Sequence, residues 1–148
     1  MQAQEFVKRV KELLPPVEES TAILRKQGFT EKSAQDWLKD YSFPRRNNTR
    51  YEEHEDPIIE LLTNFDLFGF AAMSFCFESE LTSEDGRIIF GSLEAEPLSI
   101  NVGTGEIEMY SHDNDKYLLD CAASSSQFLD ALFVATELYI NRMLDKAD

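Results

Sequence analysis

The stretch Pro97-Leu98-Ser99-Ile100-Asn101-Val102-Gly103-Thr104-Gly105-Glu106-Ile107-Glu108-Met109-Tyr110 decides the fold class of this chain. Apolar and polar residues alternate on both sides of Gly103-Thr104-Gly105, which is the period of a strand with one buried face. Glycines between two such runs are typical of a hairpin turn. We expect the apolar residues to face the core; these are Leu98, Ile100, Val102, Ile107 and Met109. The polar residues are expected to face solvent; these are Ser99, Asn101, Glu106 and Glu108.

Further strands are expected on both sides of this hairpin. Phe68–Phe77 is apolar on both alternating faces, which predicts a central strand covered on both sides. Ile88–Leu93 and Tyr117–Cys121 predict two more short strands. Together these segments predict an antiparallel β meander in the middle of the chain.

Helices are expected before and after the meander. The periodicity predicts three short helices before Tyr41, with breaks at Pro15-Pro16 and Gly28, and a fourth that begins with the cap Asp56-Pro57. Residues 42–56 are expected to form a surface loop. The capping box Ser124-x-x-Gln127 predicts a long final helix from about Ser125 to Leu144. The fold class is therefore α+β, a single domain over residues 1–148 with N-terminal helices, a central antiparallel meander and a long C-terminal helix packed on the sheet.

The charge is uneven along the chain. Residues 1–50 hold ten Lys and Arg against seven Asp and Glu, whereas residues 51–148 hold four against twenty-one, and the net charge is −14. Between Tyr51 and Asp115 the one basic residue is Arg87, against sixteen acidic residues. Such a field repels nucleic acid and lipid headgroups and attracts basic proteins, so we expect neither a nucleic-acid nor a membrane partner.

Other features favour a cytoplasmic, non-enzymatic protein. The N-terminus lacks the apolar segment of a signal peptide, and Cys76 and Cys121 are expected to be buried free thiols. His54 lies among acidic neighbours, which indicates a solvated loop. Ser111-His112-Asp113 resembles a triad only in composition, because triads are assembled across a fold. Asp113-Asn114-Asp115 lacks the glycine of a calcium loop. We therefore expect no catalytic residues, no cofactor and no bound metal.

The acidic residues of the hairpin region are the candidate partner-binding site. Alternation places Glu106 and Glu108 on the face opposite the core, and the adjoining loops add further carboxylates. The expected acidic patch comprises Glu94, Glu96, Glu106, Glu108, Asp113 and Asp115. The alternative is a solvated face that binds no partner.

From Ile88 onward the chain resembles the SUKH superfamily of bacterial immunity and related proteins. The similarity lies in an ordered pattern over residues 88–135: Ile88-Ile89-Phe90-Gly91-Ser92, then the Thr-Gly hairpin, then Tyr110-Ser111-His112-Asp113, and then Leu119–Ala122 followed by the helix start at Ser124. Leu14-Pro15 matches the Leu-Pro near the N-terminus of that family. Glu96-Pro97 departs from it, because the family often has Gly-Asp before the first hairpin strand, and this leaves the subgroup open.

The resemblance implies an α+β fold and a non-enzymatic role. Members commonly bind and neutralise a cognate toxin, often a nuclease or deaminase, and others serve as intracellular scaffolds. The acidic charge agrees, because a nuclease presents a basic cleft to nucleic acid. An alternative is a secretion chaperone, which would bind a basic or unfolded protein segment as an obligate dimer; the sequence leaves the oligomeric state open. A small enzyme is a third class, disfavoured by the lack of a catalytic constellation.

Overall fold

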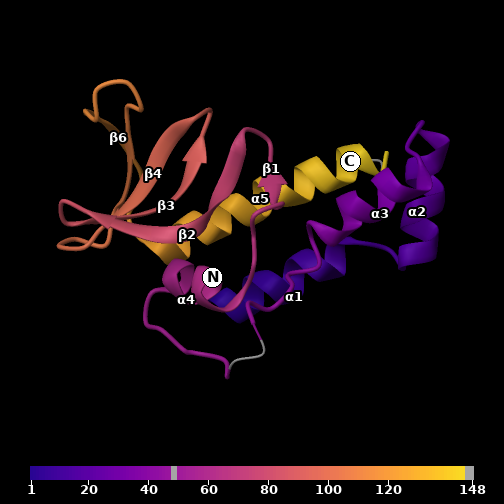
Figure 1. Ribbon diagram of the computed structural model, residues 1–148, viewed down its shortest axis with the longest axis horizontal. Helices are drawn as coiled ribbons and strands as arrows, with labels where there is room; N and C mark the ends of the chain where they lie inside the picture. Colours follow the sequence, from indigo (N-terminus) through magenta and orange to yellow (C-terminus); the bar gives the residue numbers. More distant parts are fainter. Residues whose placement is uncertain (48–49, 146–148) are drawn as a thin grey trace.

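The computed structural model describes residues 1–47 and 50–145 and has the predicted α+β architecture (Figure 1). Its elements are α1 (Ala3–Leu13), α2 (Val17–Lys26), α3 (Glu31–Lys39), α4 (Pro57–Asn64), β1 (Ala71–Ala72), β2 (Phe75–Glu84), β3 (Arg87–Leu93), β4 (Glu96–Asn101), β5 (Ile107–Tyr110), β6 (Tyr117–Ala122) and α5 (Ser125–Met143). None of these helices, over the residues described, is long and apolar enough to cross a membrane.

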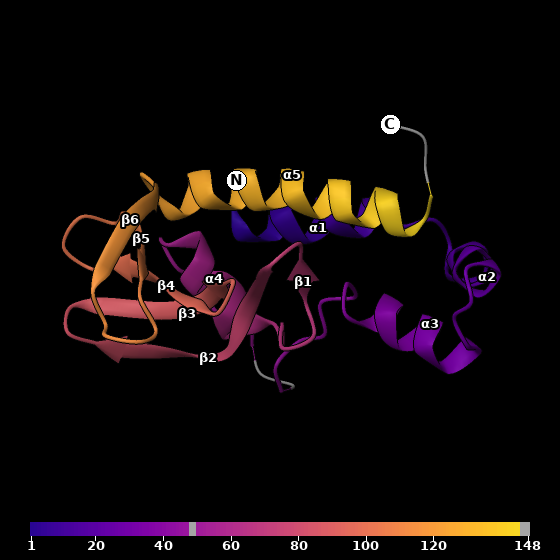
Figure 2. The same ribbon diagram turned by 90° about the horizontal axis from the view of Figure 1, so that it is seen from above.

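The sheet is a six-stranded antiparallel meander with the strand order β1-β2-β3-β4-β5-β6. Helix α5 contacts both edge strands, and α1 lies beside α5 (Figure 2). Helices α2 and α3 contact each other at the opposite end of the molecule from β6. Aromatic side chains fill the interface between the sheet and α5, where Phe128 contacts Phe75 and Phe90 with ring centroids 5.5 and 5.3 Å away.

Side-chain caps fix where α4 and α5 begin. Asp56 accepts hydrogen bonds from the backbone N–H groups of Ile58 and Ile59, and Pro57 follows as the first helical residue. The Ser124 hydroxyl accepts from the N–H of Gln127, as the capping box predicts. Asp56 also accepts from the Ser125 hydroxyl at 2.7 Å, so a single carboxylate joins the N-termini of both helices.

The prediction of one central strand over Phe68–Phe77 is wrong. The chain turns at Met73, whose φ is 56°, so this segment forms β1 and the start of β2 as a hairpin. Phe70, Phe75 and Phe77 are buried, but Phe68 is 74% exposed. Strand β2 then continues to Glu84 through exposed polar residues, which carry no hydrophobic signal.

The expectation of buried thiols is also wrong. Cys76 is exposed on β2, and Cys121 is half-buried on β6; both are free. Cys76 lies beside Ser92, with Sγ and Oγ 3.2 Å apart. Both thiols lie toward the edges of the sheet, Cys76 on β2 beside the edge strand β1 and Cys121 on the edge strand β6, where side chains are less covered.

The two faces of the β4–β5 hairpin only partly match the alternation. Leu98, Ile100 and Ile107 are buried as predicted, but Val102 lies beyond the end of β4 and is 62% exposed. On the other face, predicted to be solvated, Ser99 is fully buried and Glu108 is 8% exposed. Register shifts in the β2–β3, β3–β4 and β5–β6 pairings increase the twist of the sheet, so this second face curls inward and covers its own polar residues.

Residues 42–47 and 50–56 form no helix or strand, apart from an isolated bridge between Arg45 and Phe65. This agrees with the loop expected over 42–56, of which residues 48 and 49 lie outside the described residues. Phe43 is nevertheless buried, with its ring 6.0 Å from that of Phe6, so the loop is anchored to the core at its start.

Candidate functional site: the acidic end of the sheet

Two tight turns and two loops carry the carboxylates at the ends of the strands. Asp85-Gly86 joins β2 to β3 and Glu94-Ala95 joins β3 to β4, and all four residues have positive φ. Two central residues with positive φ are the mark of a type I′ turn, whose twist matches that of the flanking strands. These turns therefore hold Asp85 and Glu94 outward at opposite ends of β3.

Arg87, the one basic residue between Tyr51 and Asp115, is buried on the curled face of the sheet. Its side chain is 6% exposed, its Nη2 donates to Asp115 Oδ1 at 2.6 Å, and its guanidinium lies 3.7 Å from the centre of the Tyr110 ring. Arg87 belongs to β3, whereas Tyr110 and Asp115 belong to β5 and the loop after it. This contact therefore holds the 111–116 loop across the curled face.

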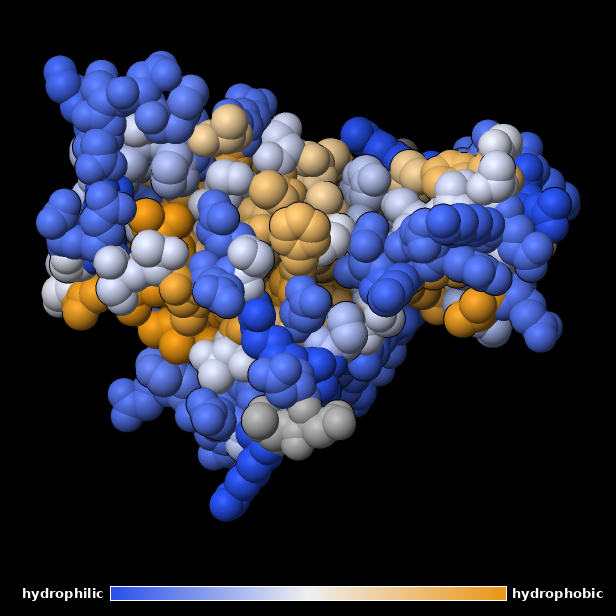
Figure 3. Space-filling model, in the orientation of Figure 1, coloured by the Kyte–Doolittle hydropathy of each residue, from blue (hydrophilic) through white to orange (hydrophobic). Residues whose placement is uncertain are grey.

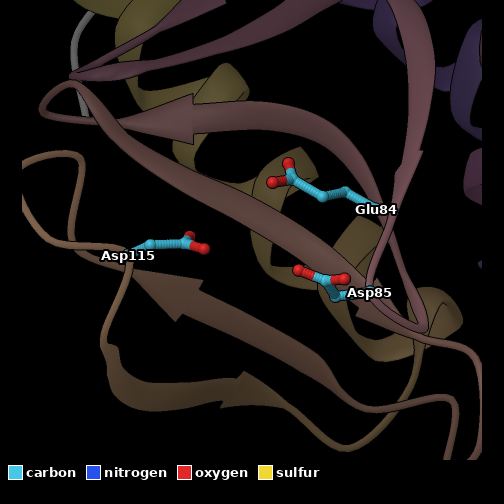
Figure 4. Close-up of side chains that lie close together, drawn as sticks. All are labelled: Glu84, Asp85 and Asp115. Carbon is cyan, nitrogen blue, oxygen red and sulfur yellow. The ribbon is translucent and has the colours of Figure 1, made fainter.

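A first cluster of three carboxylates surrounds this contact (Figure 4). Glu84 and Asp85 extend from the β2–β3 hairpin and Asp115 from the facing loop, and one oxygen of each lies within 4.8 Å of the others. All three residues are exposed. Arg87 neutralises one of these charges, so the cluster presents a net negative charge to solvent.

His112 joins two of the predicted site residues. Its Nδ1 lies 3.0 Å from Glu96 Oε2 and its Nε2 lies 3.1 Å from Asp113 Oδ1, and its backbone N–H donates to Glu96 at 2.7 Å. The hydrogen bond to Glu96, followed by the charge of Asp113, raises the pKa of His112 above its ordinary value. The same backbone bond, followed by the His112 side chain, lowers the pKa of Glu96. The Ser111 hydroxyl accepts from the backbone N–H of Asp113, and both imidazole nitrogens of His112 face carboxylates.

A second cluster of three carboxylates lies on β6, on β5 and on the residue that immediately precedes β5. Glu106, Glu108 and Asp120 each place an oxygen within 4.8 Å of the other two. Glu106, Asp120 and Cys121 line a pocket of about 250 Å³ beside them. This cluster contains two of the residues predicted from the sequence, together with one from the neighbouring strand.

The structure distributes the six predicted site residues over three places. Glu94, Glu96 and Asp113 lie at the β3–β4 turn and the β5–β6 loop, which the contacts of His112 join. Asp115 lies in the first carboxylate cluster, and Glu106 and Glu108 lie in the second. Five of the six are exposed or half-buried, and Glu108 is the buried exception.

Sequence reasoning missed part of this surface. Glu84 and Asp85 immediately precede Gly86, a turn signal that could have placed them at a hairpin tip. Asp120 carries no such signal, because its position depends on the register between β5 and β6. Strand β6 also exposes a run of large side chains: Tyr117, Leu118 and Leu119 are 52%, 44% and 46% exposed.

The acidic turns and loops and the exposed strand β6 all belong to the sheet, which lies at the opposite end of the molecule from α2 and α3 (Figures 1 and 2). Figure 3 shows hydrophilic side chains over the region of β6 and the loop before it, with hydrophobic side chains reaching the surface toward the middle of that face. A partly apolar strand among carboxylates can bind a surface that is apolar at its centre and basic around it. Searches with family models, curated proteins and solved structures find no match to this chain.

Proposed function

We propose that the protein is a non-enzymatic binding protein whose acidic end docks a partner protein with a basic surface, and that it serves as an immunity protein against a cognate toxin. The toxin class that fits is a nuclease or deaminase, since such an enzyme needs a basic cleft for nucleic acid. The cell compartment that fits is the cytoplasm, where the toxin would act. The resemblance of residues 88–135 to the SUKH superfamily supports the same role.

The observation that carries the proposal is the combination of Tyr117–Leu119 with the carboxylates around it. Tyr117, Leu118 and Leu119 are about half exposed on the edge strand β6, where Tyr117 and Leu119 leave opposite faces of the sheet and so flank its open edge. Asp113 is exposed on the loop that leads into β6, and Glu94 is exposed on the β3–β4 turn, two residues before Glu96, which contacts His112 of that loop. An apolar centre with a charged rim is the usual anatomy of a specific interface.

Arg87 strengthens the electrostatic part of this argument. Since the guanidinium is buried and paired with Asp115, it adds little positive charge to the surface. The meander therefore presents its carboxylates without an exposed arginine among them, and with Lys116 of the β5–β6 loop as its one lysine, a basic partner meets a predominantly negative field. Such a field speeds association with a basic partner and disfavours acidic ones.

The test uses a folded nuclease or deaminase toxin domain with a basic surface and measures its binding at fixed salt. We expect Glu94→Lys with Asp113→Lys to weaken binding at least tenfold, about 1.4 kcal/mol. The matched control is Glu12→Lys with Glu137→Lys, which changes the net charge equally on exposed positions of α1 and α5. If both pairs weaken binding equally, the acidic end is not the docking surface.

A second variant separates the apolar centre from the charged rim. Leu118→Ala is expected to speed dissociation and leave the association rate unchanged, because short-range packing acts mainly on dissociation.

A secretion chaperone would prefer an unfolded segment to a folded domain, so the folded toxin domain and its denatured fragment are compared in the same assay. Preferential binding of the fragment would contradict the immunity role.

A further inference from the structure

The second carboxylate cluster is built by the pairing of β5 with β6. Glu108 and Asp120 are direct partners across the two strands, so their side chains leave the same face of the sheet. Glu106 precedes Glu108 by two residues and lies on that face too. The result is three carboxylates with oxygens within 4.8 Å of one another.

This cluster lacks a countercharge. Glu108 is 8% exposed, and its carboxylate accepts two hydrogen bonds, from Asn101 Nδ2 and from the Tyr110 hydroxyl, both at 3.4 Å. Asp120 interacts with the Tyr117 hydroxyl. All three donors are neutral. In the described part of the chain no lysine, arginine or histidine forms an ion pair with any of the three carboxylates. A buried charge is costly unless it is paired or binds a metal.

Ser99 gives an independent indication of a missing ligand. Its side chain is fully buried, and its Oγ has no hydrogen-bond partner. It lies on β4 directly opposite Glu108, so its hydroxyl faces the same side of the sheet as the carboxylates. Buried hydroxyls are nearly always hydrogen-bonded or bound to an ion, because leaving them unpaired costs free energy.

We propose that Glu106, Glu108 and Asp120, with the Ser99 hydroxyl, bind one Ca²⁺ ion. The ligands are all oxygens, which suits a hard divalent cation. Ca²⁺ accepts irregular sets of oxygen ligands, whereas Mg²⁺ requires a near-octahedral set. The three carboxylate oxygens lie within 4.8 Å of one another, so one ion can contact all three. The sequence indicated no metal, because these ligands come from three strands and only the sheet register unites them.

The first cluster is a matched control within the same protein. The carboxylate oxygens of Glu84, Asp85 and Asp115 also lie within 4.8 Å of one another, but Asp115 already binds the guanidinium of Arg87. All three are exposed to water, so no buried charge has to be neutralised. This cluster is therefore not expected to bind Ca²⁺.

Calorimetric titration of the metal-free protein with CaCl₂ tests the proposal. One equivalent of Ca²⁺ is expected to bind, more tightly than Mg²⁺, and to raise the thermal midpoint. Glu106→Gln and Asp120→Asn, which keep an acceptor oxygen at half-buried and exposed sites, are each expected to weaken binding at least tenfold. Ser99→Ala is expected to weaken it about tenfold. Asp85→Asn is expected to bind as the parent does.

Two results would overturn the proposal. The first is no binding heat and no shift of the thermal midpoint at about 10 mM Ca²⁺, which exceeds the dissociation constants of weak extracellular calcium sites. The second is equal weakening in Asp85→Asn and Asp120→Asn, which would indicate diffuse attraction by the acidic surface. Glu108→Gln covers the case in which the buried charge itself destabilises the protein: it is expected to abolish Ca²⁺ binding while the calcium-free protein keeps or gains thermal stability. Retained binding in that variant contradicts the site.

Discussion

Replacing Arg87 by methionine should release the 111–116 loop from the sheet. Methionine keeps an apolar side chain of similar length and removes the guanidinium, which donates to Asp115 at 2.6 Å and stacks 3.7 Å above the Tyr110 ring. These two contacts join β3 to the loop that carries Asp113 and Asp115. The substitution also leaves Glu84, Asp85 and Asp115 close together without a cation.

The loss of stability follows from the two contacts. A hydrogen bond to a charged group contributes about 1.5–3 kcal/mol, and a desolvated cation–π contact about 2 kcal/mol. The Asp115 side chain is 59% exposed, so water solvates its carboxylate once Arg87 is gone and the ion pair counts for less than a fully buried one. We expect Arg87→Met to lower the free energy of unfolding by about 2–4 kcal/mol.

Urea unfolding measures this effect. With a slope of about 2 kcal/mol per molar, the midpoint should fall by about 1–2 M. The double-mutant cycle with Asp115→Asn should give a coupling free energy of about 1–2 kcal/mol. A midpoint within about 0.3 M of the parent would refute the reasoning, because Arg87 would then contribute no more than an ordinary surface residue.

Two further predictions concern the loop and the helix caps. His112 should titrate above its ordinary pKa because Glu96 and Asp113 favour the imidazolium in the folded protein. Its contribution to loop stability is therefore present below pH of about 6.5 and is lost as the pH rises through the folded pKa. An NMR titration should show the His112 midpoint above about 6.5 in the parent and closer to it in Glu96→Gln, and a parent midpoint at or below this value would contradict the geometry. Asp56→Ala removes the cap of α4 and the acceptor for Ser125, and should lower stability by about 1–3 kcal/mol in thermal or urea unfolding. The neighbouring exposed Glu55→Ala is its control and should change stability by less than about 0.5 kcal/mol, and equal effects would refute the role of the shared cap.

Local signals predicted much of the fold. Asp56-Pro57 and Ser124-x-x-Gln127 marked the starts of α4 and α5, because a cap acts through bonds to residues two or three positions away. The glycines at 103–105 marked the β4–β5 hairpin, where Gly105 has a φ of 78°. The α+β class followed from the order of these elements.

The parts that failed depend on contacts between distant residues. The polarity of Ser99 and Glu108 suggested a solvated face, but the curl of the sheet and the contact between Arg87 and the 111–116 loop bury that face. The turn at Met73 carries no glycine or proline, so the break between β1 and β2 had no local signal. The candidate site was predicted as one patch, because the register that separates Glu106 and Glu108 from Asp115 is a property of the folded sheet.

The central claim is that the acidic end of the sheet docks a basic partner. The most direct measurement is the association rate with a basic nuclease or deaminase toxin domain as a function of salt concentration. Exposed charges are screened beyond about 8 Å at physiological ionic strength, so the rate should fall steeply as salt rises, and Glu94→Lys with Asp113→Lys should flatten that dependence. The same rate at every salt concentration, unchanged by this charge reversal, would contradict the claim.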